Sequence, residues 1–243
     1  MKDYGIIIPA HNEAEHIESF VGRFIRDLPD AVRGSLLEVI LVENGSTDGT
    51  AEACRRLQEQ FPDLVRVLVN ERPSYGEAIK RGMLESRGRY LSILECDFLD
   101  REFVSDSLEL LRSGKTRFIV ASKRHPRSVD ERPFKRRMLT LGFNLILNLF
   151  LGYPGSDTHG LKSIETSLAQ ELCQRAQTTD ELFQTELALL AWRWGNRIEE
   201  LPISIREQRP TTVSVARRLP KVAHMVWALR KSIKRFPRAP VSG

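Results

Sequence analysis

The sequence is poor in cysteine and lacks long apolar runs. Its three cysteines, Cys54, Cys96 and Cys173, form no CxxC pair and no even set. This arrangement excludes a disulfide framework and a structural zinc site, and it indicates a reducing compartment. No run of about eighteen apolar residues occurs, so we expect no segment to span a bilayer. We also expect no signal peptide, because charged residues and Pro9 interrupt the first apolar stretch. We therefore expect a cytoplasmic location.

The composition favours one globular core with a basic surface. The chain has 243 residues, of which 41% are hydrophobic and 28% are charged, enough for a single sizeable core. The net charge is +5, and Lys and Arg concentrate in residues 123–137 and 206–238. A basic patch binds nucleic acid, an anionic membrane or a phosphorylated substrate, and the sign of the charge does not choose between them.

The first half of the chain alternates short apolar runs with helical patterns. Runs rich in Ile, Val and Leu predict strands at 4–8, 38–42, 64–69, 90–94 and 118–121. Apolar residues at a spacing of three to four predict helices at 13–28, 47–60, 76–86 and 102–111. Asn12 and Glu15 are arranged as a capping box for the first of these helices. Such alternation predicts an α/β, Rossmann-like, mostly parallel sheet flanked by helices, with its ligands at the carboxyl ends of the strands.

The second half is more helical and more basic. We expect helices at 138–153, 163–174, 181–194 and 221–235, and a strand at 197–205. The helix at 138–153 is apolar nearly all round, which fits a buried helix, a dimer interface or a helix resting on an anionic membrane. Basic residues precede it, and the last helix combines Trp227 with several Lys and Arg, which is typical of a peripheral membrane surface.

Polar residues follow three of the predicted strands. Glu95 and Asp97 end the fourth strand one residue apart, so a cation could bridge them to a phosphate-bearing ligand. His11 lies in the IPAHNE segment that opens a helix, whose free N–H groups suit an anion. Glu43 and Asn44 begin a glycine-rich turn and match the donors and acceptors of a nucleobase or ribose. Alone, each of these motifs is also compatible with an ordinary capped turn.

Taken together, the motifs resemble those of family 2 glycosyltransferases of the GT-A fold, and their layout is similar to that of polyprenyl- (dolichyl-) phosphate sugar synthases. The segments are IPAHNE, VENGSTDGT, PSYGEAIKRG and ECD, and the likeness covers roughly residues 4–215. The resemblance implies that Asp97 and Glu95 hold Mg²⁺ or Mn²⁺ on the donor diphosphate. It also implies a nucleotide pocket made by Pro9, His11, Glu13, Glu43, Asn44, Gly76 and Cys96.

Two departures bear on the metal site. Glu43 and Glu95 stand where the family usually has Asp, so each carboxylate sits on an arm longer by one methylene. We therefore expect Asp97 to be the main metal ligand and Glu95 a secondary one.

Basic residues downstream resemble phosphate contacts of the same family. Lys123 lies in an element similar to the family's GSR, Arg137 in its basic pair before an interfacial helix, and Arg206 in its YRERR-like loop. Residues 155–162 resemble the DxxSGF(R/K) element with one residue fewer, which leaves the roles of Asp157 and His159 open.

Two further carboxylates are candidates for a general base. We expect Asp180 to cap the helix at 181–194 and Glu186 to lie on its polar face. Neither is needed as a base if the acceptor is a phosphate, which is already an anion.

The resemblance predicts a metal-dependent, inverting transfer of a sugar from a GDP- or UDP-linked donor to a polyprenyl phosphate at the cytoplasmic face of a membrane. The alternatives are a soluble or cell-envelope saccharide acceptor, or a non-catalytic basic module that binds membrane or nucleic acid. The carboxylates argue against nucleic acid, because they repel phosphate unless a cation is present. We expect a GT-A domain at 1–215, with a nucleotide half at 1–123 and an acceptor half at 124–215, then a basic amphipathic extension at 216–243. The sugar, the base and the presence of a homo-oligomer stay open.

Overall fold

The computed structural model describes residues 2–158, 160–205 and 219–234. Within them, seven strands form one sheet in the order β3-β2-β1-β4-β7-β5-β8. These strands are β1 (Tyr4–Ala10), β2 (Leu36–Asn44), β3 (Val65–Asn70), β4 (Tyr90–Ile93), β5 (Phe118–Ser122), β7 (Lys162–Glu165) and β8 (Ile198–Pro202). All neighbouring pairs are parallel except those of β7, which runs antiparallel to both β4 and β5. The predicted α/β, mostly parallel sheet is confirmed.

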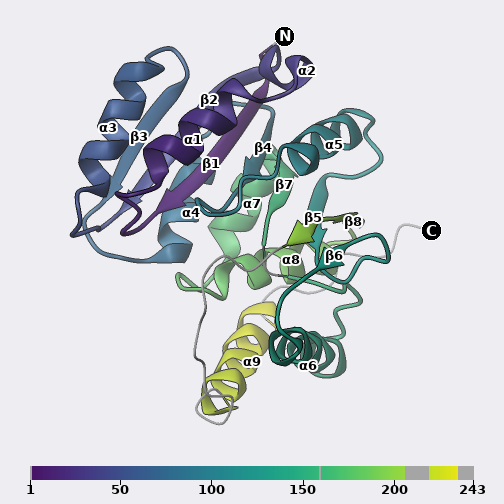
Figure 1. Ribbon diagram of the computed structural model, residues 1–243. Coiled ribbons are helices and arrows are strands. Elements are labelled where there is room, and N and C mark those ends of the chain that lie inside the picture. The colour runs from purple at the N-terminus through teal and green to yellow at the C-terminus, as the bar shows by residue number, and fades with distance from the viewer. Residues whose placement is uncertain (1, 159, 206–218, 235–243) are drawn as a thin grey trace.

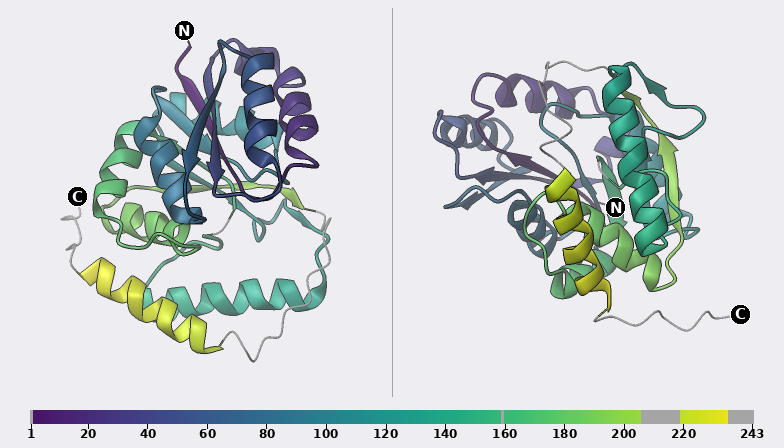
Figure 2. Two further views of the ribbon diagram at one scale, coloured as in Figure 1. Left: turned by 90° about the vertical axis from the view of Figure 1, so that its left-hand side faces the viewer. Right: turned by 90° about the horizontal axis from the view of Figure 1, so that it is seen from below.

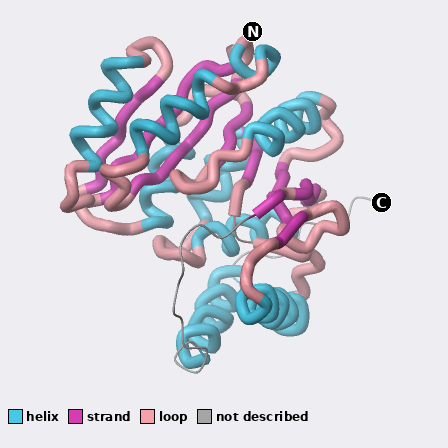
Figure 3. The backbone as a smooth tube through the Cα atoms, in the orientation of Figure 1, coloured by secondary structure: helices cyan, strands magenta, loops and turns pink. Residues whose placement is uncertain are grey.

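Helices cover both faces of this sheet (Figures 1 and 3). One face packs against α1 (Ile17–Arg26), α3 (Thr50–Gln60) and α5 (Arg101–Arg112). The other packs against α4 (Tyr75–Glu85), α7 (Thr166–Arg175) and α8 (Phe183–Arg193), and a short helix, α2 (Asp30–Arg33), precedes β2. Because both faces are covered, the central strands are buried along almost their whole length and consist mainly of apolar residues.

Two more helices lie below the sheet layers, as Figure 2 shows. They are α6 (Phe134–Leu151) and α9 (Leu219–Lys234), which contact each other, and α9 also contacts α8. We call this pair the α6–α9 ledge. In the described residues, no helix combines the length and the hydropathy that crossing a membrane would require.

Three sequence predictions about local structure are wrong. The helix expected at 163–174 begins only at Thr166, because residues 162–165 form β7 between β4 and β5. The first helix begins at Ile17, since Asn12 adopts a φ of 55° and accepts a hydrogen bond from Thr47 N instead of capping. The strand expected at 197–205 is interrupted at Ile203 and continues as β9 (Ser204–Ile205), which pairs with β6 (Val129–Asp130).

Candidate active site

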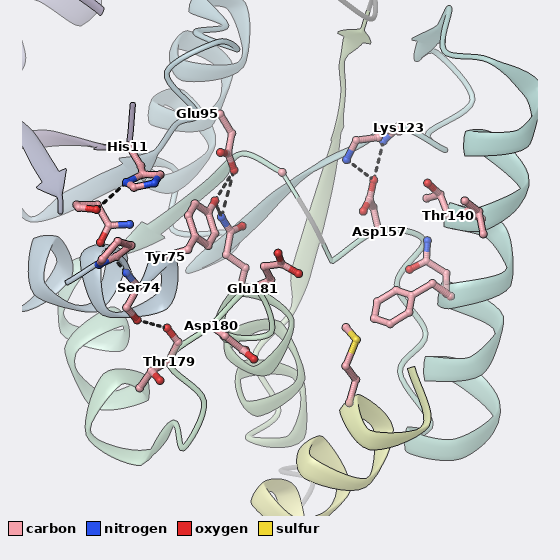
Figure 4. A pocket seen from close by; sticks show the side chains of 18 of the residues that line it. His11, Ser74, Tyr75, Glu95, Lys123, Thr140, Asp157, Thr179, Asp180 and Glu181 are labelled. Carbon is pink, nitrogen blue, oxygen red and sulfur yellow. Dashed lines mark hydrogen bonds and ion pairs between the residues drawn. The ribbon is translucent and has the colours of Figure 1, made fainter. Parts of the chain in front are cut away.

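A pocket of about 1020 Å³ opens at the carboxyl ends of the parallel strands (Figure 4). One wall carries polar residues that follow β1, β2, β3, β4 and β5; among them are His11, Asn44, Ser74, Tyr75, Glu95 and Lys123. The opposite wall comes from the α6–α9 ledge and contains Leu139, Phe143 and Met225. The cavity therefore has a polar side at the sheet and an apolar side at the ledge.

The loops after β1 and β2 brace each other at the polar side. His11 Nδ1 donates to the Asn44 carbonyl oxygen over 2.9 Å. Asn12 Oδ1 accepts from Thr47 N at 3.0 Å. The backbone of the first loop donates in turn to side chains of the second, through Asn12 N to Ser46, Glu13 N to Thr50 and Ala14 N to Asp48. We call residues 11–14 and 43–50 the donor edge, and its cross-bracing fixes the shape of this side of the pocket.

Asn44 ties the donor edge to the start of α4. Its Oδ1 accepts from Ser74 N at 2.9 Å and lies 3.4 Å from Asn70 Nδ2. The side chain is 4% exposed, yet the residue lines the pocket. Because Ser74 precedes the first turn of α4, this contact brings a helix N-terminus, with its partial positive charge, to the pocket wall.

The predicted nucleotide-binding residues divide into two groups. His11 and Asn44 line the pocket. Glu43 is 3% exposed and its Oε1 accepts from Ser46 N at 2.6 Å, so it holds the glycine-rich turn. Pro9 and Cys96 are buried, and Glu13 is partly buried with its backbone bound to Thr50. Whether any of these residues touches a nucleotide stays a prediction.

Gly76 has a packing reason for being glycine. A Cβ at this position would lie 2.5 Å from the carbonyl carbon of Thr179 and 2.8 Å from the Asp180 oxygen. Ser74 Oγ donates to the Thr179 oxygen at 2.6 Å, and Glu77 N to the same oxygen at 3.2 Å. Gly76 thus allows the segment before α8 to lie directly on the start of α4.

Glu95 and Asp97 follow β4 but lie in different surroundings. Phe98 N donates to the Glu95 carbonyl oxygen at 2.9 Å, which closes a turn after the strand. Glu95 lines the pocket and accepts a hydrogen bond from the Tyr75 hydroxyl, whereas Asp97 is exposed. Burial raises the pKa of Glu95, and the nearby Asp97 charge adds to the rise, against the hydrogen bond from Tyr75 and the charges of Lys162 and Lys123. The Asp97 charge therefore acts on Glu95, although Asp97 is not among the residues that line the pocket.

Lys123 and Asp157 form an ion pair in the pocket wall. Their Nζ–Oδ2 distance is 3.1 Å, and the side chains are 11% and 2% exposed. The Lys123 backbone N lies 3.3 Å from the same oxygen. Gly160 has a φ of 109°, and a Cβ there would be 3.2 Å from Lys123 Nζ. The residues predicted from the 155–162 resemblance thus surround the Lys123 ammonium, although His159 lies outside the described residues.

Sequence reasoning missed the contacts around Lys162. This lysine is 1% exposed, and its Nζ donates to the Gly160 carbonyl oxygen at 3.1 Å and to Gln184. Burial lowers the pKa of Lys162 to about 7; the charge of Lys123 acts in the same direction, while those of Asp157 and Glu95 oppose it. Gln184 also donates to the Tyr75 hydroxyl. No spacing rule signals such contacts, because they join residues from four separate segments.

Asp180 and Glu186 have different structural roles. Asp180 Oδ1 accepts from Leu182 N at 2.9 Å, so it caps the turn before α8, as expected, and it also lines the pocket. The prediction that Glu186 lies on a polar face is wrong, because it is 0% exposed. Its carboxylate accepts from Gln177 N at 2.9 Å, from Thr178 N at 2.8 Å and from Ser232 Oγ. Glu186 therefore joins α8 to the preceding loop and to α9.

Two further basic residues that the sequence predicts as phosphate contacts are Arg137 and Arg206. Arg137 is exposed in the first turn of α6, and Arg206 lies outside the described residues. Arg132, which the sequence did not single out as a contact, lines the pocket and makes two hydrogen bonds to Asp130, at 2.8 and 2.7 Å.

Two asparagines attach the otherwise apolar α6 to the site. Asn144 Nδ2 donates to the Ser156 carbonyl oxygen at 2.5 Å, and Asn148 Nδ2 to that of Tyr153 at 3.0 Å. Ser156 is bound in turn to Glu200 and precedes Asp157. The outer side of α6 instead exposes a row of apolar side chains at helical spacing, which we call the α6 stripe: Phe134, Met138, Leu141, Leu145 and Leu149.

The carboxylates near the pocket suit a divalent ion only when a bound ligand supplies further oxygen atoms. Within the described residues, no three His, Cys, Asp or Glu side chains are grouped as a metal site. Mg²⁺ is commonly bound by one or two carboxylates plus substrate phosphates. Glu95 lines a pocket that also contains Lys123, and the charge of Asp97 acts on Glu95, so the two carboxylates offer that pattern.

Comparison with known proteins identifies the family. The family model described as glycosyl transferase family 2 matches residues 5–169. The chain belongs to this family. Glycosyltransferase AglD of Haloferax volcanii is 27% identical over 217 residues, which cover 88% of this chain and 35% of AglD. The dolichyl-phosphate β-glucosyltransferase of Saccharomyces cerevisiae is 27% identical over 87% of this chain and 69% of its own length.

Solved structures confirm the fold of this family 2 enzyme. Glucosyl-3-phosphoglycerate synthase of Mycobacterium tuberculosis superposes with a TM-score of 0.67 at 19% identity, covering all of this chain and 83% of the other. A second structure of that synthase, at 21% identity and a TM-score of 0.67, contains Mn²⁺, UDP and phosphoglyceric acid. The chain thus has the predicted GT-A fold of a family 2 glycosyltransferase. It spans about a third of AglD and about two thirds of the yeast enzyme.

Proposed function

We propose that this chain transfers a hexose from a UDP-linked donor to a polyprenyl phosphate, with a divalent ion and with inversion at the anomeric carbon. The observation that carries the proposal is the pocket with two unlike walls, polar at the strand ends and apolar at Leu139, Phe143 and Met225. A nucleoside diphosphate fits the first wall, and a phosphate on a hydrocarbon chain needs both. The dolichyl-phosphate glucosyltransferases among the relatives support the acceptor class.

In this proposal, the residues of the polar wall stabilise the departing nucleoside diphosphate. Asp97 and Glu95 would hold Mg²⁺ or Mn²⁺, which supplies positive charge to the diphosphate when it is bound. The N-terminus of α4 and the Lys123 ammonium face the same space and offer further positive charge. His11 and Asn44 form the part of the wall assigned to the nucleoside.

The acceptor needs orientation more than activation. A phosphate oxygen is already anionic, so a protein base has little to remove. This agrees with the structural roles of Glu186 and Asp180, whose carboxylates accept backbone hydrogen bonds. Arg132 in the pocket wall is placed to meet an incoming phosphate, and we propose Arg137 and Arg206 as further phosphate contacts.

The α6 stripe supports a membrane-bound acceptor. Its exposed fractions reach 73% at Phe134 and 69% at Leu149, and Trp227 of α9 is 59% exposed. Lys135 and Arg137 are exposed in the first turn of α6, so apolar and basic side chains meet at one end of the stripe. Such a surface binds the interface of an anionic bilayer through apolar burial and charge attraction. We therefore propose reversible, peripheral attachment through the α6–α9 ledge.

A transfer assay tests this function directly. Purified protein is incubated with UDP-glucose, UDP-N-acetylglucosamine or GDP-mannose, with and without Mn²⁺, and offered either polyprenyl phosphate in anionic vesicles or 3-phosphoglycerate in solution. We expect Mn²⁺-dependent transfer from a UDP-sugar to the lipid. Transfer to 3-phosphoglycerate alone would replace the lipid acceptor with a soluble phosphate, and Mn²⁺-independent transfer would remove the metal.

A further inference from the structure

A row of hydrogen bonds connects a buried lysine to the rim of the pocket. Lys162 Nζ donates to Gln184 Oε1, Gln184 Nε2 donates to the Tyr75 hydroxyl, and that hydroxyl donates to Glu95 Oε1. The four residues come from β7, α8, the first turn of α4 and the turn after β4. Figure 4 shows Tyr75 and Glu95 facing each other at this rim. The row therefore joins four separate elements behind one pocket carboxylate.

The direction of the row is fixed at both ends. A carboxylate only accepts, so the Tyr75 hydroxyl uses its one proton on Glu95 and must accept from its other neighbour. That neighbour is the amide nitrogen of Gln184. The amide oxygen of Gln184 therefore faces Lys162 and accepts from it. Up to about pH 7, where Lys162 keeps its proton, the ammonium group only donates and requires the same orientation of Gln184. A glutamine is the side chain that satisfies both demands at once.

Burial makes this order hard to rearrange. Lys162 is 1% exposed and Gln184 is 2% exposed, so water does not compete for their hydrogen bonds. Lys162 Nζ also donates to the Gly160 carbonyl oxygen, which is 3.1 Å away and is a pure acceptor. Flipping the amide of Gln184 would place two donors against each other at Lys162 and would leave Tyr75 without its donor.

The row acts on one oxygen of Glu95. Both donors, the Tyr75 hydroxyl and Gln184 Nε2 at 3.4 Å, approach Oε1. We propose that Tyr75 and Gln184 are positioning residues that hold Glu95 by Oε1 and thereby present Oε2 to the metal–nucleotide complex, with Lys162 setting the direction of the hydrogen bonds. This inference rests on the proposed function, because it assumes that a divalent ion accompanies the nucleotide.

The substitution Gln184→Glu separates positioning from structure. The new carboxylate keeps the size of the side chain and gives Lys162 an opposite charge, but it also lies beside the Glu95 carboxylate, so the melting temperature of the apo protein is measured as the check on folding. It cannot donate, however, and it draws the Tyr75 proton away from Glu95. The readout is the ratio of UDP affinity with and without Mn²⁺, measured by titration calorimetry. We expect this ratio to fall roughly tenfold, the usual effect of losing one hydrogen bond to a charged group.

Tyr75→Phe and the double variant test whether the row acts as a unit. Tyr75→Phe removes the last donor, so its ratio should fall by a similar factor. Because both changes break the same connection, the double variant should lose little more than either single one. The matched control is Gln58→Glu on α3, where the side chain is exposed and the same added charge should leave the ratio unchanged.

Each outcome decides between the two proposals. A wild-type ratio of one would remove the metal from the proposed function, and this inference with it. A large wild-type ratio that both variants retain, or that rises in Gln184→Glu, would overturn the positioning role alone. Losses that simply add in the double variant would show two independent contacts and would also overturn it.

Discussion

The donor edge and the α6–α9 ledge differ in how completely their groups are bonded or buried within the chain. At the donor edge, backbone N–H groups of residues 12–14 each find a side-chain acceptor in the neighbouring loop. Along α6, by contrast, six apolar side chains are at least 41% exposed, and α6 also contacts α9. These N–H groups of the donor edge are thus hydrogen-bonded within the chain, whereas the ledge leaves apolar surface exposed to water.

This difference indicates where each region meets its partner. A cross-braced loop pair presents a fixed shape, which suits a small polar ligand whose orientation matters. An exposed apolar row with basic residues at one end suits a large partner that has no fixed shape, such as a bilayer surface. The pocket lies between them, so the enzyme's two substrates would approach from different kinds of surface.

The largest expected effect concerns the carboxylates at the polar wall. Asp97→Ala should lower turnover by about 10²-fold or more, because it removes the main proposed ligand of the ion that stabilises the leaving group. Asp97 is exposed, so the melting temperature should stay unchanged. The measurement is UDP release with saturating donor and Mn²⁺. Full activity in this variant would remove Asp97 from the metal site. The control is Asp106→Ala on α5, an exposed residue that does not line the pocket, and it should match the wild type.

The ion pair between Lys123 and Asp157 in the pocket wall should contribute to the stability of the fold. Lys123→Ala removes the ammonium 3.1 Å from a carboxylate that is 2% exposed. Leaving such a charge without its cation costs about 3 kcal/mol of unfolding free energy. Urea unfolding of Lys123→Ala and of Lys115→Ala, whose side chain is exposed, measures the difference. Equal stability of the two variants would contradict a structural role for this pair.

The sequence predicted the strands β1 and β2 better than β7 for a physical reason. The apolar residues of β1 and β2 are a strong local signal for buried strands. The turns that follow parallel strands lie at the same edge of the sheet, so the topology brings them together. Strand β7 has no such signal, because Lys162 and Ser163 are buried only through neighbours distant in the chain. Its antiparallel insertion between β4 and β5 is a tertiary effect that overrides the helical pattern.

The same distinction applies to single site residues. His11 and Asn44 were expected from their motifs and line the pocket. Glu186 was misplaced because helical periodicity does not reveal that a loop and α9 cover the polar side chain. Asn144 and Asn148 interrupt the apolar pattern of α6, and only the structure shows that they hold residues 153–156.

Charging the α6 stripe tests the ledge without disturbing the core. Leu145→Asp with Leu149→Asp replaces side chains that are 53% and 69% exposed, so stability should hardly change. Binding to anionic vesicles should weaken by roughly tenfold to a hundredfold, because two leucines no longer enter the bilayer interface. Leu84→Asp on α4, which is 46% exposed, is the matched control and should bind as the wild type does.

A different outcome of that experiment would redefine the ledge. If the stripe is a contact between two copies of the chain, the wild type sediments as a dimer and the double variant as a monomer, with no vesicle binding by either. If it is neither, both proteins sediment as monomers and stay in the supernatant with vesicles. Either result would contradict membrane binding by the ledge. Neither would affect the interpretation of the donor edge as a surface for a small ligand.

The smallest expected effect is the pH dependence of stability from Lys162, the buried cation between the two regions. Burial brings the pKa of Lys162 to about 7 in the folded chain, below the value of 10.5 for an exposed lysine. Above about pH 7 the unfolded chain therefore holds a proton that the folded chain lacks, so stability rises with pH. Between about pH 7 and about pH 8 the gain is about 1 kcal/mol. Urea midpoints of the wild type and of Lys162→Met measure it, since the variant lacks this titration while its histidines titrate as before. Parallel pH profiles would mean that Lys162 stays charged in the fold, and that its neighbours compensate its burial more fully than the contacts to Gly160 and Gln184 indicate.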